Sequence, residues 1–165
     1  MCEGKTTNGK WLAKQLGKKF IDLDHQIEQK SGATIAQIFE FEGEPGFRIR
    51  ESAALAEALS EENQVIATGG GAVLANENRE LMKQRGIIIF LNIPPEIQLQ
   101  RLLKDTKRPL MQTPNKAQRL QQLAEIRTPI YQECADLQLE LSSIPLSQVR
   151  QRLLNLLTTY EHFHG

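Results

Sequence analysis

Residues 4–24, GKTTNGKWLAKQLGKKFIDLD, form the stretch that decides the fold of this 165-residue chain. The stretch opens with Gly-Lys-Thr-Thr, which matches the end of the pattern G-x-x-x-x-G-K-[ST]. In that pattern backbone N–H groups bind nucleotide phosphates, the lysine neutralises them and the hydroxyl holds Mg²⁺. Residues 5–16 then show helical spacing of apolar residues, Gly17 is a stop signal, and residues 19–22 read as a short strand. The sequence therefore predicts an α/β fold that begins at a phosphate site.

The first half of this phosphate-binding pattern is absent from the sequence. Its first glycine should lie five positions before Gly4, whereas the chain starts at Met1. No residues remain to form the strand from which such a loop normally emerges. Taken alone, the short string is equally compatible with a frayed N-terminus. We therefore expect a chain that lacks the first strand and half of the loop, through a misassigned start or through trimming, which leaves its ATP binding in question.

Composition is that of an ordinary soluble globular protein. Forty per cent of the residues are hydrophobic and 24% are charged, with 20 basic residues balancing 20 acidic ones. The net charge therefore indicates neither nucleic acid nor a membrane surface as a partner. Cys2 and Cys134 are too few for a disulfide framework or a metal cluster, which suggests a reducing, cytoplasmic setting. The sequence shows no signal region and no apolar run that approaches the roughly 20 residues of a membrane span.

Strands alternate with helices along the rest of the chain. Beyond the first strand, residues 64–68, 87–92 and 137–141 read as strands, and the continuously apolar run at 87–91 is typical of a strand buried on both faces. Helices are expected at 24–30, after Thr34, at 45–59, at 76–85, after Pro94, after a polar loop at 105–115, and at 149–157. This alternation predicts a parallel sheet covered by helices on both faces.

Two carboxylates follow the first predicted strand. Asp22 and Asp24 are two residues apart, so on a strand they would share a face. They would lie at the carboxyl end of a parallel strand, where open α/β sheets bind ligands. Either aspartate could instead cap the helix that follows. After a phosphate-binding helix, the pair favours Mg²⁺ and hydroxyl chemistry.

Two further motifs could contact a ligand. Arg48 and Glu51 are three apart on a predicted helix, where such pairs are usually solvated. Alternatively, Arg48 binds a carboxylate or phosphate through two hydrogen bonds and Glu51 holds it in place; the residues leave both readings open.

The run at 69–71, three glycines after an apolar strand, is more specific. Three glycines are costly to order, but they let a ligand approach the backbone and its free N–H groups.

Positive charge gathers before and within the polar loop at 105–115. Arg101, Lys107 and Arg108 belong to this group, which in most proteins would be solvated surface. In a phosphoryl-transfer enzyme the same group would form a lid, with an arginine that closes on the transferring phosphate. Arg127 could be one more surface charge.

Together these strings resemble the shikimate kinase family over about residues 4–157. The resemblance rests on residues 20–24, on 39–44 leading to Phe47-Arg48, and on 69–71, 107–110 and 127–131. It implies a three-layer P-loop kinase fold with a parallel sheet in the order 2-3-1-4-5, of which strand 1 is missing here. The strands at 64–68 and 87–92 would then face each other across a gap. It also implies a single kinase domain over residues 1–165, with substrate-binding helices at about 24–60 and a lid at about 105–116.

The implied activity is ATP-dependent phosphorylation of the shikimate 3-hydroxyl, a step in chorismate and aromatic amino-acid biosynthesis. The resemblance implies Mg²⁺ as the cofactor, ATP and shikimate as the partners, and a cytoplasmic monomer. On the ATP side it implies Gly4, Lys5, Thr6, Thr7, Arg101 and Arg108. Lys5 would contact the β- and γ-phosphates, Thr6 would ligate Mg²⁺, and Asp22 would reach the metal through water. Arg101 would lie against adenine, and Arg108 would close with the lid.

On the substrate side the resemblance implies Asp24, Arg48, Glu51, Gly69, Gly70, Gly71 and Arg127. Asp24 would orient the accepting hydroxyl or take its proton, which makes it the expected catalytic residue together with Lys5 and Arg108. Arg48 and Arg127 would hold the shikimate carboxylate, with Glu51 bracing Arg48. The backbone at 69–71 would contact the substrate.

Two other readings stay open. One is a different small-molecule P-loop kinase, of the gluconate or nucleoside-monophosphate type, although two arginines suit a carboxylated polyol better than a nucleotide. The other is a truncated, non-catalytic remnant that binds shikimate or another partner without turnover, which the absent half-loop favours. Calorimetric titration with Mg·ATP would separate the remnant from an active kinase.

Overall fold

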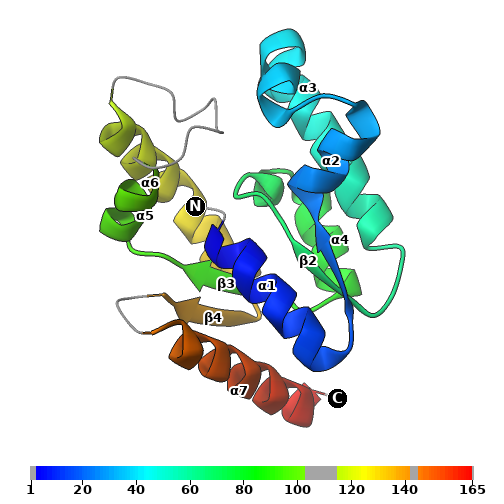
Figure 1. Cartoon of the computed structure of the whole chain (residues 1–165), viewed down its shortest axis with the longest axis vertical. Coiled ribbons are helices and arrows are strands. Elements are labelled where there is room, and N and C mark those ends of the chain that lie inside the picture. The colour runs from blue at the N-terminus through cyan, green and yellow to red at the C-terminus, as the bar shows by residue number, and fades with distance from the viewer. Residues whose placement is uncertain (1–2, 103–114, 142–144, 165) are drawn as a thin grey trace.

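The computed structural model describes residues 3–102, 115–141 and 145–164, which form two parallel two-stranded sheets with helices around them (Figure 1). In the first sheet β1 (Lys19–Asp22) pairs with β2 (Gln64–Ala67). In the second, β3 (Ile89–Asn92) pairs with β4 (Leu137–Glu140). Within the described residues β2 and β3 form no ladder with each other. In the sheet order 2-3-1-4-5 that the family resemblance implies, these two pairs correspond to strands 2-3 and 4-5, on either side of strand 1.

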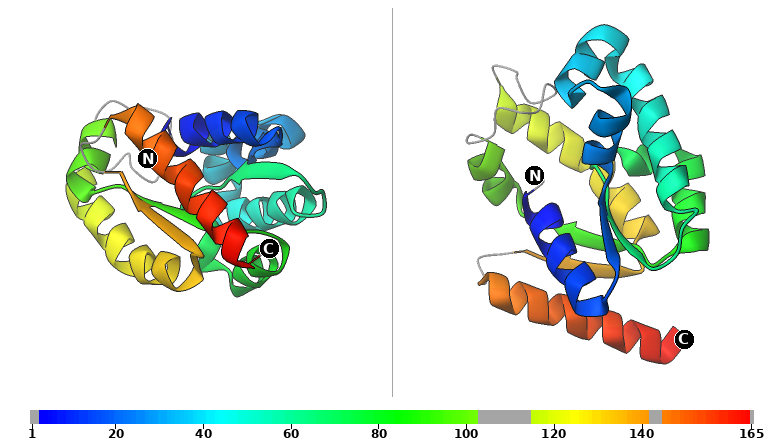
Figure 2. Two further views of the ribbon diagram at one scale, coloured as in Figure 1. Left: turned by 90° about the horizontal axis from the view of Figure 1, so that it is seen from below. Right: turned by 45° about the vertical axis from the view of Figure 1, so that its right-hand side comes forward.

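The helices surround the sheets as the alternating sequence pattern predicts. They are α1 (Glu3–Leu16), α2 (Leu23–Ser31), α3 (Ile35–Ala58), α4 (Asn76–Arg85), α5 (Pro95–Leu102), α6 (Lys116–Cys134) and α7 (Leu146–His164), with a 3₁₀ turn, η1, at Ala72–Leu74. Figure 2 shows α2, α3 and α4 beside the first sheet and α5 and α6 beside the second, with α1 between the two groups. None of the helices in the described part is long and apolar enough to cross a lipid bilayer.

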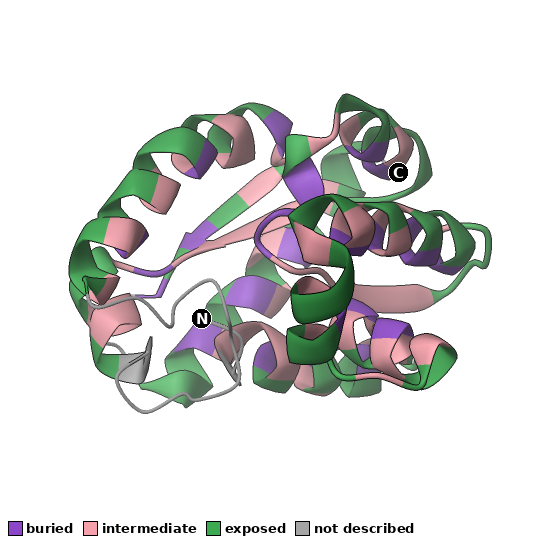
Figure 3. Ribbon diagram, turned by 90° about the horizontal axis from the view of Figure 1, so that it is seen from above, coloured by how far each residue is buried: buried purple, intermediate pink, exposed green. Residues whose placement is uncertain are grey.

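Two large hydrophobic clusters hold these layers together. Figure 3 shows where buried residues lie along the ribbon. The first joins α2, α3 and α4 to the first sheet, with Leu23 and Leu55 almost fully buried. The second joins α1 and α7 to the second sheet around Leu12 and Leu153, and Val65 of β2 packs against it. A fully buried leucine contributes roughly 1.5–3 kcal/mol. Because α1 and β2 contribute to the second cluster, side-chain packing connects the two sheets where hydrogen bonds do not.

The expectation that residues 87–91 are buried on both faces is wrong. Every residue of β3 is only partly buried, and Ile87, just before the strand, is 38% exposed. The residues of β2 are partly buried as well. Within the described residues each of these strands has a ladder partner on one side only. The other edge of each strand has no ladder partner in the described residues. Apolar side chains there therefore stay accessible that a further strand at that edge would cover.

Helix α3 carries a kink that separates two helices predicted from the sequence. Thr34 caps its start, and its hydroxyl accepts a hydrogen bond from the Gln37 N–H in a capping box. The chain leaves helical geometry at Gly43, whose φ is +68°, a conformation that favours glycine. The helix resumes by Pro45, which fits a first helical turn because it needs no N–H donor there. The second half of α3 then carries Arg48 toward the ends of the strands.

Candidate active site

The carboxyl end of β1 supplies two carboxylates. Asp22 ends the strand and caps α2, since its Oδ1 accepts a hydrogen bond of 3.3 Å from the His25 N–H. Asp24 lies in the first turn of α2. The expectation that both side chains share one strand face is therefore wrong, because the chain turns into a helix at Leu23. The two carboxylates still lie close enough for Asp22 to raise the pKa of Asp24.

The first turn of α1 faces the ends of both strands in the first sheet. The Thr6 hydroxyl donates a 3.0 Å hydrogen bond to Asp22 Oδ2 at the end of β1. The Lys5 ammonium donates to the Thr68 carbonyl, 3.4 Å away, just past the end of β2. Burial lowers the pKa of Lys5, and Asp24 partly offsets that effect. Lys5, Thr6 and the Asp22 carboxylate therefore meet at a helix N-terminus, which favours anions.

Asp24 is the titratable group whose environment is most suggestive of proton transfer. Burial, together with the nearby Asp22 and Glu51 carboxylates, raises its pKa from 3.8 to about 6 against the opposing effect of Lys5. A carboxylate that titrates near neutral pH is a stronger base than an ordinary aspartate. Perturbed carboxylates of this kind concentrate at functional sites.

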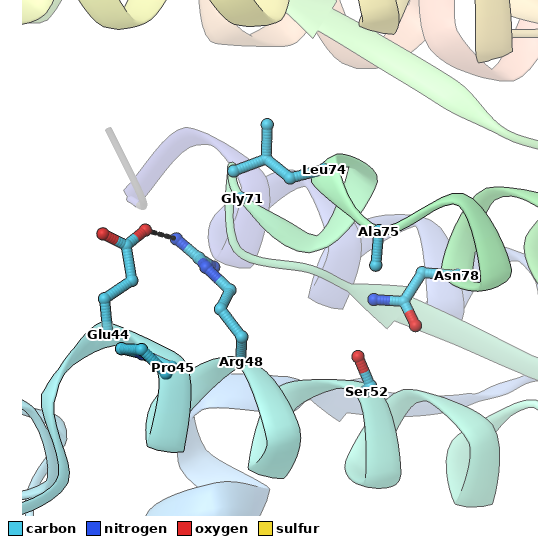
Figure 4. Close-up of a pocket in the computed structure, with 8 residues that line it drawn as sticks. All are labelled: Glu44, Pro45, Arg48, Ser52, Gly71, Leu74, Ala75 and Asn78. Atoms are coloured by element: carbon cyan, nitrogen blue, oxygen red, sulfur yellow. Dashed lines mark hydrogen bonds and ion pairs between the residues drawn. The ribbon is translucent and has the colours of Figure 1, made fainter.

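Arg48 is held by two glutamates on its own helix. Its guanidinium donates to Glu51 Oε1 at 2.6 Å. It also donates to Glu44 Oε1 at 3.1 Å (Figure 4). Glu51 is 1% exposed, so the pair with Arg48 is not the solvated surface pair that spacing alone suggested. Burial raises the pKa of Glu51 even though Arg48 opposes this. Burial also opposes the charge of Arg48, but Glu51 and Glu44 outweigh it and raise the pKa of the guanidinium.

A cavity of about 440 Å³ opens beside Arg48, between α3 and the segment formed by η1 and α4. Its lining residues are Glu44, Pro45, Arg48, Ser52, Gly71, Leu74, Ala75 and Asn78 (Figure 4). Neither Lys5 nor Asp24 belongs to this lining. The cavity therefore adjoins the guanidinium side of the site and leaves space around Arg48.

The glycine run that follows β2 packs directly against charged side chains. A Cβ atom on Gly71 would lie 2.3 Å from the Arg48 guanidinium nitrogens. A Cβ atom on Gly69 would lie 3.1 Å from Glu51 Oε2 and 3.5 Å from Asp24 Oδ1. These positions therefore need glycine for close approach, and they bring backbone against Arg48, Glu51 and Asp24 together.

The second arginine enters the site from α6. Arg127 is 6% exposed, and it is close enough to Lys5 and Glu51 to influence the pKa of each. Among the described residues, the buried Nε atoms of Arg48 and Arg127 have no hydrogen-bond partner. The described residues thus gather three cations (Lys5, Arg48 and Arg127) around the buried Glu51 carboxylate, and Asp24 lies near Lys5 and Glu51. That arrangement suits a ligand with a carboxylate at one end and a hydroxyl at the other, next to a phosphate donor.

Two residues of the expected ATP side lie wholly or partly outside the described part of the chain. Arg108 and most of the expected lid fall within residues 103–114, which the structure does not describe. Arg101 lies in α5, but its side chain is also outside the described part. Gly4 and Thr7 lie in the first turns of α1 with Lys5 and Thr6.

Tyr131, for which no role was predicted from the sequence, reaches the same site. Its hydroxyl donates a hydrogen bond to the Gly70 carbonyl, and its ring stacks on Phe90 of β3 with 4.7 Å between ring centres. The sequence did offer one signal for such a role: Tyr131 lies four residues after Arg127, so on a helix the two side chains share a face.

Comparison with known proteins identifies the family. The family model "Shikimate kinase" matches residues 1–158. Shikimate kinase of Acinetobacter baumannii (strain AYE) is 48% identical over 95% of this chain and 87% of its own length. That of Psychrobacter cryohalolentis is 54% identical over 82% of this chain and 73% of its own length.

Solved structures give the same family. The structure of shikimate kinase from Acinetobacter baumannii in complex with shikimate matches with a TM-score of 0.91, at 48% identity over 95% of this chain and 88% of that one. The structure from Aquifex aeolicus matches with a TM-score of 0.82, at 34% identity over 98% of this chain and 94% of that one. The chain belongs to the shikimate kinase family.

Proposed function

We propose that the site between α1, α2, α3 and α6 transfers the γ-phosphate of ATP to the 3-hydroxyl of shikimate, as a step of aromatic amino-acid biosynthesis. The observation that carries this proposal is that Arg48, Arg127 and Lys5 converge on Glu51, with Asp24 near Lys5 and Glu51 at the head of α1. A relative with a TM-score of 0.91 was solved with shikimate bound.

The two arginines would bind the shikimate carboxylate. A guanidinium presents a planar fork of donors that matches a carboxylate in two parallel hydrogen bonds. Glu51 fixes the Arg48 guanidinium at 2.6 Å, so little conformational freedom is lost when the substrate binds. Backbone at Gly69, Gly70 and Gly71 would line the substrate on the side of β2.

Asp24 would act at the opposite end of the substrate. Its carboxylate would accept a hydrogen bond from the 3-hydroxyl and take the proton as the new P–O bond forms and the bond to ADP breaks. Lys5 would neutralise the β- and γ-phosphates, since phosphoryl transfer depends chiefly on positioning and charge stabilisation. On the resemblance to the family, Arg108 would join them when the lid at about 105–116 closes, and Arg101 would contact adenine.

The oxygen ligands beside α1 fit a hard divalent cation. Thr6 Oγ1 and Asp22 Oδ2 are 3.0 Å apart, and Mg²⁺ is usually held by one or two protein oxygens together with water and phosphates. No group of three or more His, Cys, Asp or Glu side chains in the described residues forms a self-contained metal site. We propose that Thr6 ligates Mg²⁺ and that Asp22 reaches it through water. When bound, Mg²⁺ would neutralise charge on the phosphates.

Replacing Thr6 by valine should weaken use of Mg·ATP. The variant keeps the shape of the side chain but removes the hydroxyl oxygen, so we expect kcat/KM for Mg·ATP to fall on the order of 100-fold. Thr6→Ser keeps the oxygen and should stay within a few-fold of the wild type. Steady-state rates as a function of Mg²⁺ concentration measure both. Equal losses in the two variants would contradict the metal-binding role of the hydroxyl.

Gly71→Ala should impair shikimate binding through Arg48. The new Cβ would lie 2.3 Å from the guanidinium nitrogens, so Arg48 must move or the loop must shift. We expect the KM for shikimate to rise at least tenfold and the protein to lose about 1–3 kcal/mol of stability. Gly86→Ala is a matched control, because no atom lies within 4 Å of a Cβ there. A wild-type KM for Gly71→Ala would contradict the placement of Arg48.

Release of ADP with a panel of acceptors tests the proposed function. Shikimate should stimulate ADP formation, whereas gluconate and nucleoside monophosphates should not, because they do not offer a ring carboxylate to the two arginines. Stimulation by either of those acceptors instead would assign a different kinase activity. Binding of shikimate without ADP formation would identify a non-catalytic chain.

We further propose that the protein works as a cytoplasmic monomer with one domain over residues 1–165 and has no nucleic-acid or membrane partner. A net charge of zero supports the absence of a polyanionic partner. Cys134 is buried and unpaired, as is usual for proteins of a reducing compartment. Light scattering at micromolar concentration would test the monomeric state.

A further inference from the structure

Tyr131 connects three parts of the site that lie far apart in the sequence. On α6, the Arg127 guanidinium lies close enough to the Tyr131 hydroxyl to oppose the rise in its pKa that burial causes. That hydroxyl donates in turn to the Gly70 carbonyl in the loop after β2. The Tyr131 ring stacks on Phe90 of β3, with 4.7 Å between centres and planes 29° apart. The ring stack and the hydrogen bond to Gly70 therefore hold the phenol in place, with the Arg127 charge close to its hydroxyl.

The hydrogen bond to the Gly70 carbonyl restricts the backbone in the glycine run. This carbonyl belongs to the peptide plane between Gly70 and Gly71, and three successive glycines would otherwise leave this plane many orientations. Gly71 in turn packs so closely on Arg48 that a Cβ there would lie 2.3 Å from the guanidinium. Fixing the Gly70–Gly71 peptide therefore also fixes the surface against which Arg48 rests.

These contacts form a chain from one arginine to the other. It runs from Arg127 through the Tyr131 hydroxyl and the Gly70–Gly71 peptide to Arg48. We propose that Tyr131 is a positioning residue for substrate binding, which sets the separation of the Arg48 and Arg127 guanidinium groups through the Gly70 carbonyl. The inference rests on the proposed roles of the two arginines as the shikimate carboxylate clamp.

The test replaces Tyr131 by phenylalanine, which removes the hydroxyl and keeps the ring on Phe90. Loss of one hydrogen bond of this kind should weaken shikimate binding about tenfold. We expect the KM and the calorimetric Kd for shikimate to rise by that factor, while kcat and the KM for ATP stay within about twofold. Tyr160→Phe is a matched control, because it removes the hydroxyl of the chain's other tyrosine, which lies on α7. It should change none of these constants.

A second variant separates the hydroxyl from packing. Phe90→Leu removes the ring stack but keeps the Tyr131 hydroxyl, so it should lower the melting temperature and leave the shikimate KM near the wild-type value.

The methyl ester of shikimate adds a further readout. It cannot form an ion pair with the arginines, so Tyr131→Phe should impair its binding much less than that of shikimate.

The outcomes distinguish this inference from the proposed function. If the wild-type chain does not respond to shikimate, the proposed function fails before any variant is compared. If the wild type phosphorylates shikimate and Tyr131→Phe lowers only the melting temperature, Tyr131 is merely structural and the inference fails alone. Equal losses for shikimate and its methyl ester would also overturn it, because the effect would then not pass through the carboxylate clamp.

Discussion

Asp24→Asn is expected to lower kcat at least 100-fold while making the folded protein more stable at about pH 7.5. Asparagine keeps the shape of the side chain and its ability to contact a hydroxyl, but it cannot accept the proton. General-base catalysis typically contributes a factor of about 10²–10⁴. For this reason the loss should appear in kcat, with only a small change in the KM for ATP.

The gain in stability follows from the raised pKa of Asp24. Its folded-state pKa is about 6, against an ordinary value of 3.8. Between these values the folded state binds more protons than the unfolded state, so stability falls as the pH rises through this window. Above about pH 6 the buried charge costs on the order of 1–3 kcal/mol, which asparagine removes. Asparagine also loses the attraction between the Asp24 carboxylate and Lys5, so we expect a gain in stability toward the lower end of this range.

Urea denaturation of both proteins at about pH 4 and pH 7.5 measures this effect. The stability difference should be present at the higher pH and nearly vanish at the lower, where Asp24 is protonated in the folded wild type. In the same pH range, the wild-type kcat/KM should rise as Asp24 loses its proton near pH 6. A variant that is less stable at both pH values, or that keeps its kcat, would contradict the assigned role.

Arg48→Ala should both destabilise the fold and abolish tight shikimate binding. The substitution removes the hydrogen-bonded partner of the Glu51 carboxylate, which is 1% exposed. Breaking a buried pair in this way typically costs about 3–5 kcal/mol. Because one of the two carboxylate-binding groups is also lost, we expect the shikimate KM to rise about 100-fold or more.

A double variant separates stability from binding. In Arg48→Met with Glu51→Gln, both buried charges are removed, so most of the lost stability should return while the shikimate KM stays high. Arg50→Ala is the matched control on the same helix, since Arg50 pairs with Glu42 at the exposed surface. It should change stability by less than about 1 kcal/mol and leave the KM unchanged. A double variant that recovers the wild-type KM would contradict direct binding of the carboxylate by Arg48.

Local patterns in the sequence predicted most of the fold. The strand at Lys19–Asp22 and the helix at Asn76–Arg85 appear where the apolar spacing and the glycine stop signals placed them. The capping box of Thr34 was also accessible, because it involves neighbours in sequence. The predictions that were wrong concern features that depend on tertiary structure. The apolar run at 87–91 stays partly exposed because burial depends on which strands lie beside it, which periodicity cannot report.

The residues of the candidate site were predicted through the family resemblance more than from spacing. Lys5, Asp24, Arg48 and Arg127 come from distant segments, and no local pattern indicates that they meet. The spacing of two also suggested that Asp22 and Asp24 share a strand face, which is wrong because the chain turns into a helix at Leu23, after the Asp22 cap. The buried state of the Glu51 carboxylate and the bond from Tyr131 to Gly70 required coordinates.

Phosphorus NMR of this chain with ATP, Mg²⁺ and shikimate tests the central claim most directly. If Asp24 orients the 3-hydroxyl toward the γ-phosphate, a phosphate monoester signal coupled to the ring proton at carbon 3 should grow in step with ADP. Formation of inorganic phosphate without any such ester, or an ATP spectrum that shikimate leaves unchanged, would contradict it.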